Sequence, residues 1–264
     1  MTLPALRPNR MLEKMKKGES ASVLFMGPFS TPEMVDAVCA AGIADVLWFD
    51  LEHLPHLAPQ LAALGMIARA YPVSTIARIQ PPTYATVMWP LEAGMNGIVV
   101  PMIETPEQAE AIVKWGKYDL GKGEGQRGWN RSFVAGAYGT IEARAYAEHQ
   151  NAQTTLMVQI ETPQGVEAAA EIASVRGIDG IFFGPGDYSH RIGQLGSFTS
   201  PQTREAMKRV AEAARKAGKW WGTPAMTPEI RKDVVAMGAQ FILVGSDNVV
   251  VQRGLEATRK ILES

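Results

Sequence analysis

Residues 154–189 read TTLMVQIETPQGVEAAAEIASVRGIDGIFFGPGDYS, and this stretch decides the fold. The run 155–160 is apolar on both faces, which is typical of a strand buried inside a parallel sheet. Thr162 and Pro163 then favour a helix, because Thr is a good N-cap and Pro suits the first helical position. A second short buried strand follows at 181–183. The stretch therefore predicts two parallel strands joined by a helix.

A carboxylate follows each of these two strands. Glu161 comes directly after the first strand, and Asp187 follows the second within Gly-Pro-Gly-Asp. Because parallel neighbours end at the same edge of a sheet, we expect both carboxylates at one mouth. Two carboxylates repel each other unless a positive group lies between them, and a divalent cation is the simplest such group. We interpret Glu161 and Asp187 as metal ligands.

The rest of the chain repeats the alternation of strand and helix. Strands are expected at 23–26, 46–49, 73–79, 97–101, 155–160, 180–183, 220–223 and 241–244. Helices are expected at 10–17, 32–41, 58–70, 83–93, 106–115, 163–175, 201–217, 228–237 and 247–262. This order predicts the α/β class, with residues 1–264 forming a single (β/α)8 TIM barrel domain that carries a short N-terminal helix. An open doubly wound sheet stays as the alternative, because sequence alone does not show closure.

Composition excludes several classes of partner. The chain is 46% hydrophobic and 20% charged, so it can bury a large core, and its net charge is −1. Lys and Arg are scattered, which leaves no electrostatic footprint for nucleic acid or a membrane surface. The N-terminus lacks the apolar run of a signal peptide and no stretch is long enough to span a bilayer, so we expect a cytoplasmic protein. We interpret the one cysteine, Cys39, as a buried small hydrophobe.

Residues 117–153 interrupt the alternation. Residues 123–128 spell GxGxxG, but they follow a predicted helix rather than a strand, which disfavours a dinucleotide site. We expect the long loop 117–138 to lie at the active-site end of the barrel, as a lid over the substrate.

Active sites of such barrels lie at the carboxyl ends of the strands. The second strand is followed by Asp50, Glu52 and His53, and Arg78 ends the third. With the two carboxylates of the metal site, these residues suit enolate chemistry on a 2-oxo acid. A divalent cation would stabilise the negative keto oxygen, and Arg78 would add a fixed positive charge beside it. His53 would move the proton, with Asp50 orienting its ring.

The loop Gly184-Pro185-Gly186 leaves room for backbone N–H groups to hold the substrate carboxylate. Structural alternatives exist for single residues: Arg78 could pair only with Asp50 or Glu52. Four matching strand ends together favour catalysis. No lysine lies within a predicted strand, which disfavours a Schiff-base aldolase.

These motifs resemble the metal-dependent (class II) pyruvate aldolases of the HpcH/HpaI family, from about residue 22 to residue 250. The matching motifs are Asp50-x-Glu52-His53, Arg78 before Pro81-Pro82, Val99-Val100-Pro101-Met102, Gln159-Ile160-Glu161-Thr162 and Gly184-Pro185-x-Asp187. The resemblance implies Glu161 and Asp187 as metal ligands, with Gln159 near the metal or its waters. It also implies Arg78 as the enolate stabiliser, and His53 with Asp50 as the acid/base pair.

The resemblance implies reversible cleavage of a 4-hydroxy-2-oxo acid into pyruvate and an aldehyde. The acid would be of the 2-keto-3-deoxy sugar acid or 4-hydroxy-2-oxoheptanedioate type, and the cofactor would be Mg²⁺, Mn²⁺ or Co²⁺. The resemblance also implies a homo-oligomer, a hexamer built as a trimer of dimers, whose last helix, here 247–262, packs on a neighbouring subunit. Two alternatives remain open: a 2-oxo-dicarboxylate lyase or decarboxylase using the same enolate, and a non-catalytic metabolite-binding barrel.

Overall fold

The strands of the computed structural model, which describes residues 6–263, follow one another around a closed parallel barrel. Closure is complete because the first strand also pairs with the last. The TIM-barrel prediction is therefore confirmed, and the open sheet is excluded. The strands are β1 (Ala21–Met26), β2 (Val46–Asp50), β3 (Ser74–Arg78), β4 (Gly97–Val100), β5 (Thr155–Ile160), β6 (Gly180–Phe183), β7 (Trp220–Pro224) and β8 (Phe241–Ser246).

The barrel interior is a packed core. Trp48 lies at its centre, with its ring 4.7 Å from that of Phe182 and 5.7 Å from that of Phe241. Small or branched side chains such as Val23 and Val99 fill the space around these rings. Because side chains close the interior, chemistry is confined to the two ends of the barrel.

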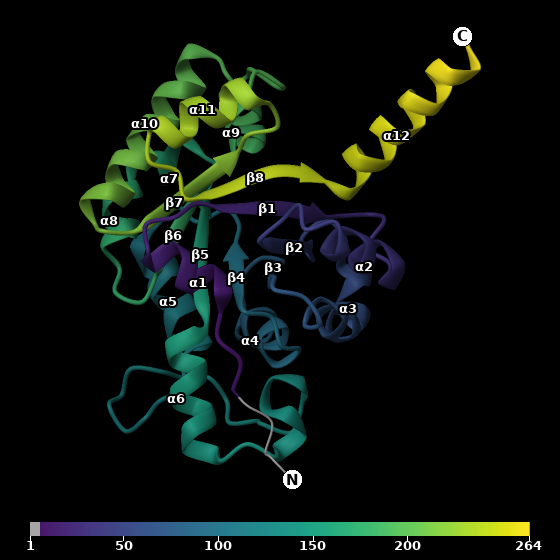
Figure 1. Cartoon of the computed structure of the whole chain (residues 1–264). Coiled ribbons are helices and arrows are strands. Elements are labelled where there is room, and N and C mark those ends of the chain that lie inside the picture. The colour runs from purple at the N-terminus through teal and green to yellow at the C-terminus, as the bar shows by residue number, and fades with distance from the viewer. Residues whose placement is uncertain (1–5, 264) are drawn as a thin grey trace.

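Helices cover the outside of the barrel (Figure 1). Their bounds are α1 (Arg10–Lys16), α2 (Pro32–Ala40), η1 (Pro55–Gln60), α3 (Leu61–Ala68), α4 (Tyr84–Glu92), α5 (Pro106–Gly116), η2 (Val134–Gly139), α6 (Ala143–Gln153), α7 (Pro163–Glu167), α8 (Ala169–Ser174), α9 (Pro185–Arg191), α10 (Pro201–Lys216), α11 (Pro228–Ala236) and α12 (Asp247–Leu262). Thr or Ser side chains cap many of them, as at Thr31 and Thr162. Cys39 on α2 is buried, as predicted, and burial raises the pKa of its thiol to about 11.

Several helices differ from the prediction, and two of these differences follow the strands β5 and β6. The helix expected at 163–175 divides at Ala168 into α7 and α8. The residues after β6 form the short helix α9, which begins at Pro185. Asp187 therefore lies in the first turn of a helix rather than in an isolated turn.

Helix α1 closes the N-terminal end of the barrel. Met11 and Met15 are buried and join the interior core. The fully buried side chain of Asn9 caps α1 and also donates to the carbonyl of Gln153 and the hydroxyl of Thr155, both at 2.9 Å. The first turn is thereby fixed to the start of β5.

The loop 117–138 is not a lid, and this prediction was wrong. Helix α5 returns the chain to the N-terminal end of the barrel, where Lys117 Nζ donates to the carbonyls of Asn151 and Thr154, both at 2.8 Å. The loop lies there and along α4, where the Tyr84 hydroxyl accepts from the N–H of Gly128. A segment between a helix and the next strand must lie opposite the carboxyl ends of the strands, which the prediction overlooked.

Helix α12 extends away from the barrel (Figure 1). It has the bounds expected from the sequence, but its apolar side chains find little cover: Leu255 is 65% exposed and Val250 is 42% exposed. Among the described residues, no helix has the length and hydropathy needed to cross a membrane.

Candidate active site

The carboxyl ends of β2 and β3 place Asp50 beside Arg78. The register of the two strands makes these residues direct neighbours. Arg78 donates from Nε and Nη2 to the two oxygens of Asp50, at 2.9 Å each. This two-fold contact fixes the plane and direction of the guanidinium group.

Glu52 also contacts Arg78. Its Oε2 is 3.1 Å from Arg78 Nε and 3.7 Å from the Nε2 of His53. The His53 ring is 66% exposed at the mouth of the barrel. Asp50, in contrast, accepts from Arg78 and from the N–H of Glu52 at 3.1 Å. The carboxylate in contact with His53 is therefore Glu52, and the expected direct contact between Asp50 and His53 is not formed.

Arg78 is held between these acids and an aromatic ring. Its guanidinium lies 5.3 Å from the centre of the Phe25 ring. Burial lowers the pKa of Arg78, but the hydrogen bond and charge of Asp50 and the charges of Glu52 and Glu161 outweigh it, so the pKa is raised. Arg78 thus carries a permanent charge in a fixed position.

Glu161 lies directly after β5 and is 1% exposed. Its Oε1 accepts from the N–H of Met102 at 3.0 Å, and its Oε2 accepts from Nε2 of Gln159. Met102 has a φ of +58°, in the left-handed region that non-glycine residues rarely adopt. This unusual backbone directs the amide toward the carboxylate, which supports a functional role for the position.

The environment of Glu161 disfavours its negative charge. Burial is the main cause, and the charges of Asp187 and Glu52 add to it. The hydrogen bonds from Gln159 and Met102 act in the opposite direction, and the resulting pKa of Glu161 is about 7. Because the charge of Asp187 contributes to the raised pKa of Glu161, the two predicted ligands lie near each other at this end of the barrel.

Asp187 extends into this basin from the first turn of α9 and is exposed. Within residues 6–263, its carboxylate has no hydrogen-bond or ion-pair partner. No side chain caps α9, so the N–H groups of Gly186 and Asp187 are left open toward the mouth. The first turn of α9 therefore offers both a free carboxylate and free amide donors.

Gly184 is required by the close approach of Glu161. A Cβ at position 184 would lie 2.6 Å from Glu161 Oε2 and 3.2 Å from Gln159 Nε2. Any larger residue would displace the carboxylate. Because Gly184 has no side chain, Oε2 of Glu161 can lie close to the backbone of residue 184.

The donors at this mouth fit a hard divalent cation. Arg78 interacts with the carboxylates of Asp50, Glu52 and Glu161, and Asp187 adds a fourth carboxylate near them, which leaves an excess of negative charge. The buried Oε1 of Gln159 has no hydrogen-bond partner. Among described residues, no three His, Cys, Asp or Glu side chains cluster as a complete metal cage. An Mg²⁺-type ion needs only one or two protein carboxylates, with water and substrate completing its shell.

Sequence reasoning gave no role to some residues of this site. Glu52 was only part of a motif, although its place two residues after a strand-end aspartate was a usable signal. Met102 was likewise only part of a motif and Phe25 was not named, because their contributions depend on a left-handed backbone and on ring position. The buried Asp247, which follows β8 and accepts from the N–H groups of Gly27 and Phe29 at 2.8 and 2.9 Å, was also missed.

The raised pKa of Glu161 predicts a pH-dependent stability. In metal-free protein the folded-state pKa of about 7 exceeds the ordinary 4.5, so the folded state binds the extra proton between these values. The free energy of unfolding should therefore fall as pH rises through this window, by on the order of 3 kcal/mol. Urea denaturation of EDTA-treated wild type and Glu161→Gln checks this. Identical pH profiles for the two proteins would contradict the assignment.

Residues 21–253 match the family described as HpcH/HpaI aldolase/citrate lyase. The chain is 32% identical over 250 residues to a hydroxypyruvate/pyruvate aldolase of Delftia acidovorans, covering 94% of this chain and 88% of that protein. It is 34% identical over 239 residues to a 5-keto-4-deoxy-D-glucarate aldolase of Shigella dysenteriae, covering 89% and 88%. A crystal structure of a family protein from Burkholderia cenocepacia superposes with a TM-score of 0.90 at 27% identity, covering 97% and 100%.

Proposed function

We propose, from the premise that the chain belongs to the HpcH/HpaI aldolase/citrate lyase family, that it cleaves a 4-hydroxy-2-oxo acid reversibly into pyruvate and an aldehyde. The protein is an aldolase, and so a carbon–carbon lyase. The names of its relatives, a hydroxypyruvate/pyruvate aldolase and a 5-keto-4-deoxy-D-glucarate aldolase, support a 2-keto-3-deoxy sugar acid or a related diacid as substrate.

Glu161 and Asp187 would hold a divalent cation, Mg²⁺, Mn²⁺ or Co²⁺, with Gln159 close to it or to its waters. Such a cation, when bound, would stabilise the negative charge that develops on the keto oxygen. The open N–H groups of Gly186 and Asp187, which follow Gly184 and Pro185, would hold the substrate carboxylate.

Arg78 and His53 would act on the reacting atoms. Removal of the 4-hydroxyl proton lets the C3–C4 bond break; its electron pair forms the C2–C3 double bond of the enolate, and the aldehyde departs. The fixed guanidinium of Arg78 would stabilise the enolate oxygen. His53 would carry the proton, which returns to C3 and completes the methyl group of pyruvate. The His53 ring is exposed and contacts Glu52, which supports proton exchange with both substrate and water.

The observation that carries this proposal is the single basin shared by Glu161, Asp187 and Arg78. The experiment is a screen of pyruvate release from 2-keto-3-deoxy acids, with and without EDTA. We expect metal-dependent release from at least one compound. Release that is unaffected by EDTA would contradict the metal part. A 2-oxo dicarboxylate is the second candidate substrate, because the family description includes citrate lyases; release of CO₂ instead of an aldehyde would favour it.

His53→Ala is expected to slow proton exchange at the pyruvate methyl group by about 100-fold or more. Metal affinity should change little, because the ring is 66% exposed and its contact is Glu52 rather than the proposed ligands. Deuterium incorporation followed by NMR measures the exchange, and calorimetry measures metal binding. His56→Ala, at another exposed histidine, serves as the control. Loss of metal binding in His53→Ala would contradict this division of roles.

We further propose that the protein is a cytoplasmic homo-oligomer, a hexamer built as a trimer of dimers, in which α12 packs on a neighbouring subunit. The exposed apolar side chains of Val250 and Leu255 support this. Replacing both by Asp should therefore reduce the molar mass measured by light scattering. An unchanged mass, or a monomeric wild type, would contradict the role of α12.

A further inference from the structure

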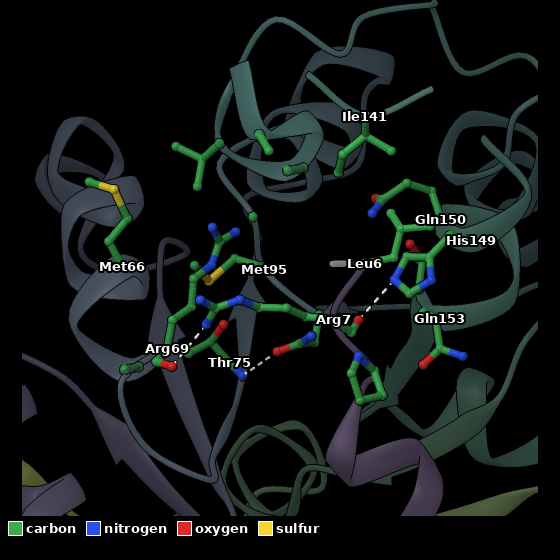
Figure 2. A pocket seen from close by; sticks show the side chains of 18 of the residues that line it. Leu6, Arg7, Met66, Arg69, Thr75, Met95, Ile141, His149, Gln150 and Gln153 are labelled. Carbon is green, nitrogen blue, oxygen red and sulfur yellow. Dashed lines mark hydrogen bonds between the residues drawn. The ribbon is translucent and has the colours of Figure 1, made fainter. Parts of the chain in front are cut away.

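A cavity lies at the N-terminal end of the barrel, opposite the candidate active site. It has a volume of about 650 Å³. The segment before α1, the end of α3, the turn η2 and helix α6 surround it (Figure 2). None of the residues proposed to act in catalysis contributes to its wall.

The wall of this cavity is positively charged. It contains Arg7, Arg10, Arg69 and His149, and none of its described lining residues is Asp or Glu. None of the three arginines forms an ion pair with a carboxylate of residues 6–263. The whole chain carries a net charge of only −1, so this local excess of cations comes from placement and not from composition.

The side chain of Arg69 is packed into the wall of the cavity. Its guanidinium packs against Gly94, where a Cβ would collide with it, and Gly94 has a φ of +93°. Burial lowers the pKa of Arg69, and the nearby charge of Arg7 lowers it further. Its side chain donates no hydrogen bond to any described acceptor. A partly buried cation without a counter-ion is costly, and a bound anion would remove that cost.

The side chain of Arg7 extends to the backbone of Arg69 (Figure 2). Nη1 of Arg7 donates to the backbone carbonyl of Arg69 at 2.9 Å. The carbonyl of Arg7 in turn accepts from His149 Nε2 at 2.8 Å. These contacts hold two guanidinium groups near each other, and most of their N–H donors remain free. Gln150 and Gln153 add neutral amides that suit hydroxyl or further oxygen groups.

We propose that this cavity binds a small organic oxyanion, with Arg69 and Arg7 as its main ligands. Guanidinium groups match the paired oxygens of phosphates and carboxylates, and both classes of anion satisfy the free donors. The site does not depend on the proposed catalytic roles, because no residue is shared between the two ends of the barrel.

The test is calorimetric titration of the full-length protein with pyrophosphate and, separately, with succinate. Wild type should bind at least one of the two, and Arg69→Gln should weaken that binding by about tenfold or more. Arg231→Gln on α11, an exposed position away from the cavity, should leave binding unchanged. Tighter binding of pyrophosphate would assign a phosphorylated ligand, and tighter binding of succinate a carboxylated one.

If Arg69→Gln does not fold, Arg7→Gln provides a second variant. The side chain of Arg7 is exposed, so its replacement should disturb the packing little. It should also weaken the binding. Failure of wild type to bind either probe, or equal binding by wild type and the cavity variants, would overturn the proposal. Neither result would affect the proposed aldolase function, which is measured by pyruvate release.

Discussion

Replacing Glu161 by Gln is expected to lower the kcat for pyruvate release by about 1000-fold and to abolish metal binding measured by calorimetry. Gln has nearly the same shape, so packing around the 1% exposed side chain should be kept. What is lost is the negative charge, and with it one of the two proposed metal ligands. Because a buried carboxylate is disfavoured without a cation, the metal-free variant should also be more stable than metal-free wild type at neutral pH.

The matched control is Glu171→Gln, at an exposed position on α8 outside the basin. It should keep wild-type kcat and metal affinity. Activity that survives both Glu161→Gln and EDTA would show that Glu161 is not a ligand for an essential cation. The proposed chemistry would then lack its main electrophile.

Arg78→Lys is expected to lower kcat by about 100-fold, with a smaller effect on KM. Lys keeps a positive charge but cannot reproduce the paired contacts of 2.9 Å with Asp50. The charge would then no longer be fixed beside the developing enolate oxygen. Steady-state kinetics measures this split, because an interaction made mainly in the transition state affects kcat rather than KM. A wild-type kcat for Arg78→Lys would contradict the proposed role.

Arg78→Ala is expected to destabilise the folded protein, an effect that is measured separately from catalysis. Asp50, whose side chain is 3% exposed, would keep a buried charge without its partner. The expected loss in the free energy of unfolding is about 3–5 kcal/mol. Arg78→Lys should lose less, because it retains a counter-charge. Equal stabilities for the two variants would indicate that the pair with Asp50 contributes little to the fold.

Much of the fold could be predicted from the sequence, because its signals are local. The bounds of β5, β6 and α12 agree with the prediction, since buried runs and strong end signals define them. The rule that strand ends carry the active site located Arg78 and Glu161 correctly at one mouth. These inferences need only hydrophobic pattern and chain order.

The remaining features depend on geometry that pattern does not encode. Whether His53 contacts Asp50 or Glu52 is decided by side-chain directions after the end of β2, and all three lie within four residues of one another. The left-handed backbone of Met102 has no composition signal, unlike that of a glycine. The misplaced loop 117–138, in contrast, could have been placed correctly from element order alone.

The projection of α12 has a consequence for how the protein assembles. A 16-residue helix whose apolar side chains are largely exposed is only marginally stable in water. Its folding should therefore be coupled to contact with another subunit, and so to the concentration of the chain. On dilution, amide hydrogens of α12 should lose protection against exchange with solvent while those of the barrel strands keep it. Subunit association would then be the last step of folding.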